Sequence, residues 1–134
     1  MTQTQKLLPI PDLDTKDFWE GCRHHYILVQ RCRNCGTFRY YPRPMCHNCN
    51  SMDTEWVRAT GKGKIYSWTV TTHQFHPNFK PPYIIAIVEL EEGIRMTSNI
   101  MDCDPEELWI GMPVEVIFDD ITSKITLPKF KPVK

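Results

Sequence analysis

Residues 32–50 read CRNCGTFRYYPRPMCHNCN, a stretch that holds two Cys-x-x-Cys pairs separated by ten residues. The first pair is Cys32 and Cys35, and the second is Cys46 and Cys49. A Cys-x-x-Cys turn points both of its sulfurs at one place, so two such turns can surround a metal ion with four thiolates. Soft thiolates at this spacing suit Zn²⁺, which is four-coordinate in structural sites and keeps no position open for a substrate. We therefore expect these four cysteines to hold a structural Zn²⁺.

Paired cysteines also occur in three other kinds of site: an iron centre of the rubredoxin type, a redox-active dithiol and a disulfide. Zinc is favoured over these because a redox dithiol needs one Cys-x-x-Cys pair, whereas this chain has two matched pairs. Gly36 and Asn50 directly follow the pairs, and both residue types accept the positive φ with which a metal-binding turn ends. A segment this small lacks a core of its own, so the expected role of the metal is to hold it in shape.

The composition of the whole chain argues against several classes of protein. The 134 residues suit one ordinary domain, or a small metal module joined to a compact barrel. Basic and acidic residues number 16 each, and neither half of the chain is strongly basic, so a nucleic-acid stripe is not indicated. No apolar run reaches the roughly 18 residues that cross a bilayer. The first residues, 1–6, lack the apolar core of a signal peptide, and we expect a cytoplasmic protein.

Apolar periodicity predicts a helix before the cysteines and strands around them. Phe18, Trp19 and Cys22 recur at helical spacing, which predicts a helix that begins near Asp14 or Thr15 and ends near His24 or His25. Strands are expected at 26–30 and 55–57, with a short strand and a proline turn over 37–45.

Residues from Gly61 onward alternate between apolar and polar, which is typical of strands with one buried face. Tyr66, Trp68, Val70 and Thr72 are expected to share one such face. The run 84–88 is apolar at every position, which indicates a strand covered on both sides, by the metal module or by a partner. A short helical turn at 104–108 separates the third strand from the fourth, the element order of a five-stranded OB-fold. The five expected strands are 64–74, 83–91, 94–101, 113–119 and 125–131.

The search for catalytic residues gives no candidate. No histidine has an acidic partner at a fixed spacing, so surface or hydrogen-bonded roles are favoured for His24, His25, His47, His73 and His76. Cys22 falls on the apolar face of the expected helix and is interpreted as a packing thiol. Cys103 lies between two aspartates, which disfavour its thiolate. Gly61-x-Gly63 is too short to be a phosphate-binding loop. We therefore expect no enzyme activity from the chain on its own.

The connection between the first two barrel strands is a candidate contact region. It is long, stiffened by prolines and rich in aromatic residues, of which Phe75, Phe79 and Tyr83 are candidates for binding a ligand or a partner. In OB-folds this loop borders the usual ligand surface. The aromatic rings could stack on nucleic-acid bases, pack against an acyl or adenine group, or anchor a partner protein. The alternative is a loop that packs only on its own barrel. Lys80 is the one formal cation of the loop, which weakens the nucleic-acid interpretation.

Several ordered motifs resemble one known family. They are the Phe18-Trp19-Glu20 helix, the cysteine turns within 28–36 and 41–49, and the barrel segments 61–70, 88–93 and 111–114. Over about residues 14–131, this order is similar to the acyl-CoA-associated family of zinc-ribbon/OB-fold proteins. His47 and Asn50 stand where that family often has proline and glycine, and both are compatible with a metal-binding turn.

The resemblance implies a mainly β fold in which an N-terminal helix precedes a rubredoxin-like zinc ribbon and a five-stranded OB-fold barrel. We divide the chain accordingly into residues 1–25 (extended segment and helix), 26–60 (zinc ribbon) and 61–134 (OB-fold). Proteins of this family look like small partners of thiolase-like enzymes, acyltransferases or hot-dog-fold enoyl-CoA hydratases. In steroid side-chain degradation, similar domains occur with an aldolase of thiolase fold. The family's catalytic residues usually lie on the partner.

The expected function is thus that of a non-catalytic accessory subunit in lipid metabolism, which docks on a thiolase-fold enzyme and helps to bind acyl-CoA. Lys62 and Lys64, at the barrel entrance, are candidate contacts for CoA phosphates, with solvated lysines as the alternative interpretation. Two rival functions are a free-standing OB-fold protein that binds single-stranded nucleic acid and an independent enzyme that acts on an acyl-CoA.

Overall fold

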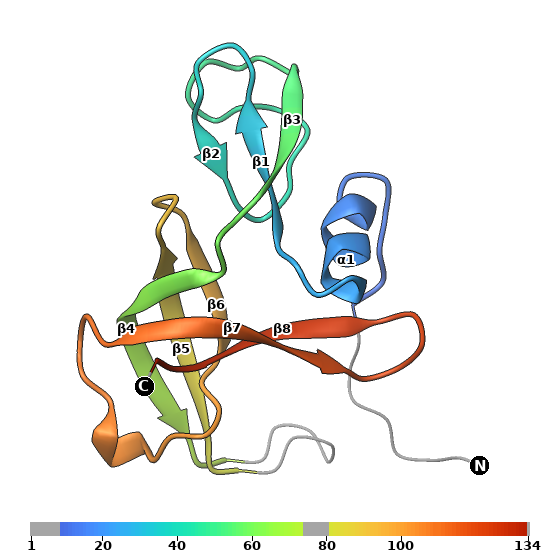
Figure 1. Cartoon of the computed structure of the whole chain (residues 1–134). Helices are drawn as coiled ribbons and strands as arrows, with labels where there is room; N and C mark the ends of the chain where they lie inside the picture. Colours follow the sequence, from blue (N-terminus) through green and yellow to red (C-terminus); the bar gives the residue numbers. More distant parts are fainter. Residues whose placement is uncertain (1–8, 74–80, 134) are drawn as a thin grey trace.

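The computed structural model describes residues 9–73 and 81–133, and it confirms the expected fold class. Within those residues one α-helix is followed by a small sheet and then by a larger, barrel-like sheet (Figure 1). The elements, in chain order, are α1 (Lys16–Arg23), β1 (Leu28–Cys32), β2 (Phe38–Arg39), β3 (Thr54–Arg58), β4 (Lys62–Thr71), β5 (Tyr83–Leu90), β6 (Arg95–Asn99), η1 (Pro105–Glu107), β7 (Pro113–Asp120) and β8 (Thr126–Pro132).

Helix α1 begins after Thr15 and ends at Arg23, within the range that the sequence predicts. Phe18 and Cys22, one turn apart, are completely buried on its inner face. His25 follows the helix in a left-handed conformation (φ 65°), and its ring stacks on Phe118 of β7 with 5.1 Å between ring centroids. The end of the helix is therefore attached to the long β7–β8 hairpin, beside which it lies in Figure 1.

The small sheet has the strand order β2-β1-β3, with both pairs antiparallel. Its interior is polar. The buried guanidinium of Arg39 donates hydrogen bonds to the Arg43 carbonyl (2.8 and 3.1 Å) and to the Thr54 hydroxyl (2.6 Å). The side chain of Gln30, also buried, accepts a bond from the Arg43 amide (2.7 Å). Apolar support comes from contacts with the common hydrophobic core, to which Val29 belongs and against which Phe38, Tyr40 and Trp56 pack.

The larger sheet has the order β6-β5-β4-β7-β8, with every neighbouring pair antiparallel. Its two edges meet where Ile100, just after β6, forms a parallel bridge with Phe130 of β8. The Met101 amide donates to the Phe130 carbonyl at the same place (2.7 Å). With η1 between its third and fourth strands, the sheet has the nearly closed topology of an OB-fold.

A bulge in β4 makes one part of the expected strand pattern wrong. The register between β4 and β5 shifts between Ile65 and Ser67, which rotates the side chains on either side of it relative to a regular alternation. Ile65 is therefore buried, and Trp68 packs against the core, whereas Tyr66 is 46% exposed. Strand β4 also ends at Thr71, earlier than the expected end at residue 74.

Strand β5 is apolar on both faces, but this chain buries only one of them fully. Ile84, Ala86 and Val88 lie in the core. Ile85 and Ile87 alternate with them on the opposite face and are only half-buried. The second face of this strand is therefore still partly open to solvent.

Candidate metal centre and barrel surface

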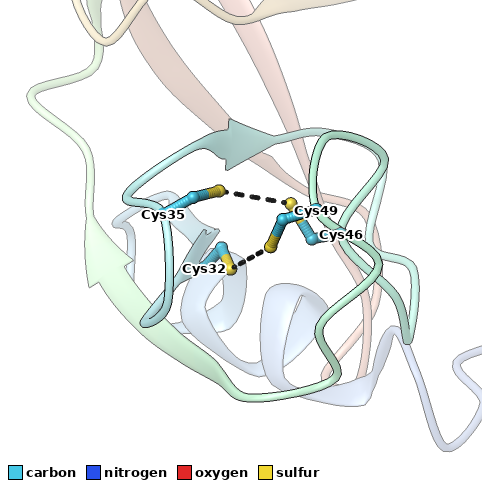
Figure 2. Close-up of side chains that lie close together, drawn as sticks. All are labelled: Cys32, Cys35, Cys46 and Cys49. Atoms are coloured by element: carbon cyan, nitrogen blue, oxygen red, sulfur yellow. Dashed lines mark hydrogen bonds between the residues drawn. The ribbon is translucent and has the colours of Figure 1, made fainter.

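The four paired cysteines come together at the end of the small sheet, as the sequence predicts (Figure 2). All four Sγ atoms lie within 4.8 Å of one another. The shortest approaches join the two pairs: Cys32 Sγ to Cys49 Sγ and Cys35 Sγ to Cys46 Sγ, both 3.6 Å. A tetrahedral zinc site with Zn–S bonds of about 2.3 Å has sulfurs about 3.8 Å apart. The spacing of this cluster fits such a site, and none of these cysteines forms a disulfide.

The two turns that position the sulfurs have the same internal hydrogen bonds. The Gly36 amide donates to the Cys32 carbonyl (2.8 Å), and the Asn50 amide donates to the Cys46 carbonyl (3.0 Å). Gly36 has φ 80° and Asn50 has φ 65°, so both adopt the positive φ expected from the sequence. The first cysteine of each pair also donates a backbone hydrogen bond to the residue five positions later. The Cys32 amide donates to the Thr37 carbonyl and the Cys46 amide to the Ser51 carbonyl, both at 2.9 Å.

Hydrogen bonds favour the thiolate, the form that binds a metal, at Cys35 and Cys32. At Cys49 the donors Asn34 and Ser51 are outweighed by burial and by the neighbouring Cys32 and Cys35 sulfurs, so the pKa of Cys49 is raised. Contacts with the Thr37 hydroxyl (3.1 Å) and the Asn48 side-chain amide (3.6 Å) lower the pKa of Cys35 to about 5. The pKa of Cys32 is also lowered, chiefly by the backbone amide of Cys35. Burial has the opposite effect at Cys22 in α1, whose pKa it raises to about 12. The donor set and the sulfur spacing suit zinc binding by the cluster, whereas Cys22 is a packing thiol.

The expected ligand or partner residues of the barrel do not form one site. Phe75 and Phe79 lie outside the described residues. Tyr83 lines a cavity of about 920 Å³ that is bounded by the ends of β5 and β6, the segment before η1, and β8. Lys62 and Lys64 lie at the opposite end of β4 from Thr71, the residue that pairs with Tyr83. Nine residues of strand correspond to about 30 Å, so the lysines are remote from this cavity.

The charged groups near the cavity also differ from those of a phosphate site. Asp102 and Asp104 line it, and its one lysine, Lys129, already forms an ion pair with Asp119 (2.8 Å). Lys64 pairs with Glu89 (3.8 Å) on the outer surface of the barrel. Within residues 9–73 and 81–133, neither place offers a cluster of unpaired cations to a CoA phosphate.

His24 and His25 each contact a carboxylate on the surface. His24 Nε2 lies 3.0 Å from Glu20 of the same helix, and His25 Nε2 lies 3.0 Å from both carboxylate oxygens of Asp120. The second contact joins the segment after α1 to the end of β7. It is a link between elements distant in sequence, in agreement with the hydrogen-bonded role expected for these histidines.

Sequence reasoning missed an aromatic residue on the outside of the barrel. Because of the bulge, Tyr66 points outward, and the Arg95 guanidinium stacks on its ring at 3.8 Å from the centroid. Tyr66 is the extra residue of the bulge, and the next residue, Ser67, pairs with Ile87; Ile85 and Tyr83 follow along β5. We call these four residues the outer face: Tyr66, Tyr83, Ile85 and Ile87. The signal in the sequence was the uninterrupted apolar run 84–88, but nothing in the pattern revealed that Tyr66 would join it.

Among the residues that the structure describes, no helix is long and apolar enough to cross a membrane. Two family models match the chain in succession: "ChsH2, rubredoxin-like zinc ribbon domain" over residues 19–55 and "ChsH2, C-terminal OB-fold domain" over residues 56–119. The solved structure "Ltp2-ChsH2(DUF35) aldolase" includes a similar chain, with a TM-score of 0.86 and 38% identity over 92% of this chain and 98% of that one.

Curated relatives are similar over most of this chain but differ in their own length. A DUF35 domain-containing scaffold protein of Methanocaldococcus jannaschii is 40% identical over 87% of this chain and 89% of its own length. A probable enoyl-CoA hydratase alpha subunit of Thermomonospora curvata is 39% identical over 94% of this chain, which spans only 40% of that protein. Benzoylsuccinyl-CoA thiolase subunit BbsA of Geobacter metallireducens is 31% identical over 81% of this chain and 75% of its own length.

Proposed function

The chain belongs to the ChsH2-like DUF35 family of zinc-ribbon and OB-fold proteins, and from this we propose that it is a non-catalytic accessory subunit of an acyl-CoA-metabolising complex. The partner we propose is a thiolase-fold enzyme. The names of two relatives support this choice, because one is a subunit of a thiolase and one belongs to an aldolase complex. A third is named as a hydratase subunit, which supports an acyl-CoA enzyme as the partner but not its fold. The catalytic groups would lie on the partner, and this chain would supply contact area and stability.

The observation that carries the proposal is the outer face of the barrel. Ile85 and Ile87 are half-buried apolar side chains in the middle of a sheet, where solvent-facing positions of an antiparallel sheet are normally polar. Contiguous exposed apolar surface of this kind marks interaction sites. Lys64 and Arg95 border the outer face, and both form ion pairs with Glu89 (3.8 and 3.4 Å). The two cations share this one carboxylate, so the border of the outer face carries a net charge of about +1. This suits an apolar protein surface better than a nucleic-acid backbone, which needs a cluster of unpaired cations.

We also propose that Cys32, Cys35, Cys46 and Cys49 hold a structural Zn²⁺. When bound, the metal would supply folding free energy to the ribbon, because small zinc modules fold around their metal. The four thiolates would fill its coordination sphere and leave no position for a substrate. The division into residues 1–25, 26–60 and 61–134 follows the same logic, with a metal-stabilised module between the helix and the barrel. A cytoplasmic location, and a contribution of Lys62, Lys64 and the 73–83 connection to acyl-CoA binding, stay predictions.

The test is a pull-down from the native host with the tagged full-length chain, followed by reconstitution with the recovered partner. We expect a thiolase-fold protein to be recovered and to form a stoichiometric complex with the purified chain. Recovery of an enzyme of another fold, or retention only of nucleic acid, would reject the thiolase-fold partner.

A substitution then tests whether the outer face is the contact surface. Ile87→Asp places a charge in the middle of the face and should weaken the reconstituted complex at least about tenfold, because interfaces do not tolerate an unpaired buried charge. Ile117→Asp is the matched control, since Ile117 is also a half-buried isoleucine in a barrel strand but lies on β7. Unchanged binding by the Ile87 variant, or equal loss with the control, contradicts docking through the outer face.

A further inference from the structure

The two cysteine pairs share an asparagine at the same position. Asn34 precedes Cys35, and Asn48 precedes Cys49. Neither side chain bonds the cysteine beside it. The Asn34 side-chain amide donates to Cys49 Sγ (3.4 Å), and the Asn48 side-chain amide donates to Cys35 Sγ (3.6 Å). Each turn therefore provides a hydrogen-bond donor to the last cysteine of the other turn.

The sulfurs that receive these amides are the two most accessible of the cluster. Cys32 and Cys46, the first cysteine of each pair, are buried. Cys35 is exposed, and Cys49 is half-buried. The crosswise bonds thus go to the ligands that water, protons and electrophiles can reach, and leave aside the two that the fold already shields.

A hydrogen bond from an amide has two effects on an exposed thiolate. Bonds to a charged acceptor are stronger than bonds between neutral groups, so the amide stabilises the negative sulfur and lowers its reactivity. Partners that bond a metal ligand also fix its orientation and strengthen metal binding. Because Cys35 has a second side-chain partner in the Thr37 hydroxyl (3.1 Å), Cys49 depends more on its asparagine than Cys35 does.

We propose that Asn34 and Asn48 are reciprocal caps of the metal centre, which retain the metal and protect the exposed ligand of the opposite turn. This inference rests on the proposed zinc site and goes beyond it, because it assigns a role to residues that are not ligands. The crosswise arrangement also makes the two turns interdependent: damage to one turn exposes a ligand in the other. If each asparagine only shaped its own turn, its loss would instead expose the cysteine of that same turn.

The experiment uses the full chain and measures zinc content first. The zinc-loaded protein is then treated briefly with N-ethylmaleimide, and the modified cysteine is identified by peptide mass spectrometry. A chromogenic chelator measures zinc release in parallel. In Asn34→Ala we expect Cys49 to be alkylated about three- to tenfold faster than in the unmodified chain, which corresponds to the loss of part of one charge-assisted hydrogen bond. In Asn48→Ala, Cys35 should react faster by a smaller factor.

Two kinds of variant keep the result interpretable. Arg33→Ala and His47→Ala change the same turns without removing a side-chain donor to sulfur, and should leave both rates unchanged. Asn34→Asp and Asn48→Asp preserve the size of each side chain but replace its donor with a charge that repels the thiolate. The aspartate variants should raise the alkylation rate of the cysteine in the opposite turn more than the alanine variants do. This comparison holds even if the alanine variants disturb their own turn.

The possible failures of this experiment are distinct. A chain that purifies without zinc, and takes up none, overturns the zinc proposal and the caps with it. A zinc-loaded chain in which Asn34→Ala exposes Cys35 of its own turn, or all four cysteines equally, overturns the reciprocal caps alone. Equal alkylation rates in the asparagine variants and in their controls, Arg33→Ala and His47→Ala, would likewise overturn the reciprocal caps alone.

Discussion

Loss of the metal should unfold the ribbon and spare the barrel. From Gln30 to Arg58, the buried apolar side chains are Pro42 and two proposed ligands, Cys32 and Cys46. The barrel strands, in contrast, bury a run of aliphatic and aromatic side chains of their own: Ile65, Ile84, Ala86, Val88, Leu90, Met96, Val114 and Phe130. The perturbation we choose is Cys46→Ser, because the Cys46 side chain is completely buried and a serine there has no solvent to compensate for the lost metal bond.

The magnitude follows from the ligand count. Structural zinc contributes about 10–16 kcal/mol of apparent binding free energy in small zinc modules, or about 2.5–4 kcal/mol for each of four thiolates. Losing one ligand should therefore weaken zinc binding about 100- to 1,000-fold, since 1.36 kcal/mol corresponds to a factor of ten. Each fully buried aliphatic side chain contributes only about 1.5–3 kcal/mol, and Pro42 is the one buried apolar side chain of this segment apart from its cysteines. The apolar support that remains without the metal comes mainly from the partly buried rings of Phe38, Tyr40 and Trp56, which pack against the common core.

The assay is amide hydrogen exchange read by mass spectrometry, with zinc content measured on the same samples. In Cys46→Ser, and in the unmodified chain after chelation, amides of residues 30–58 should lose protection while those of β5 and β6 keep it. Cys103→Ser is the control, since Cys103 is half-buried outside the cluster and should be replaceable without zinc loss. Protected ribbon amides in a zinc-free sample, or joint loss of protection in ribbon and barrel, would refute the reasoning.

Three further outcomes are expected. Gly63→Ala should lower the free energy of unfolding by about 1–3 kcal/mol in urea titrations, because a Cβ there would lie 2.5 Å from a backbone carbonyl oxygen of β5. Unchanged stability would contradict this, since it would mean that β4 and β5 can move apart to admit the Cβ at no cost. Phe18→Ala should cost about 3–5 kcal/mol in the same assay, because the ring is fully buried. The Thr126 hydroxyl and then His25 hold the pKa of Asp120 below its usual range, so this carboxylate stabilises the fold above about pH 4. That contribution is lost as the pH falls through the lowered pKa, and Asp120→Asn should flatten the acid limb of the stability profile.

The sequence was most informative where chemistry depends on short spacing. Two Cys-x-x-Cys pairs were sufficient to predict the cysteine cluster, because each turn fixes its own sulfurs and Gly36 and Asn50 permit the backbone to close it. Period-two alternation predicted where the barrel strands begin and end to within about three residues. It failed at Tyr66, because a bulge adds one residue to a strand without any change in composition that the alternation could reveal.

Long-range relations were beyond the sequence for a geometric reason. Lys64 was expected at the barrel entrance and Tyr83 in the loop that borders the usual ligand surface of OB-folds, and both were candidate binding residues. Antiparallel pairing puts them at opposite ends of the β4–β5 ladder. The identical positions of Asn34 and Asn48 are visible in the sequence, yet their reach to the opposite turn depends on how the two turns face each other. Such contacts follow from tertiary arrangement, which local spacing does not determine.

The two proposed roles of the chain depend on different physical supports. Thiolate chemistry holds the ribbon, whereas apolar burial holds the barrel and so presents Ile87 to a partner. The supports meet at α1, whose Phe18 belongs to the common hydrophobic core, and at His25, which stacks on Phe118 of the β7–β8 hairpin. Ribbon side chains join this core as well, since Val29 belongs to it and Phe38 and Trp56 pack against it. Because the barrel strands bury aliphatic side chains of their own, a chain that has lost its zinc should keep an intact docking face while losing a defined ribbon orientation.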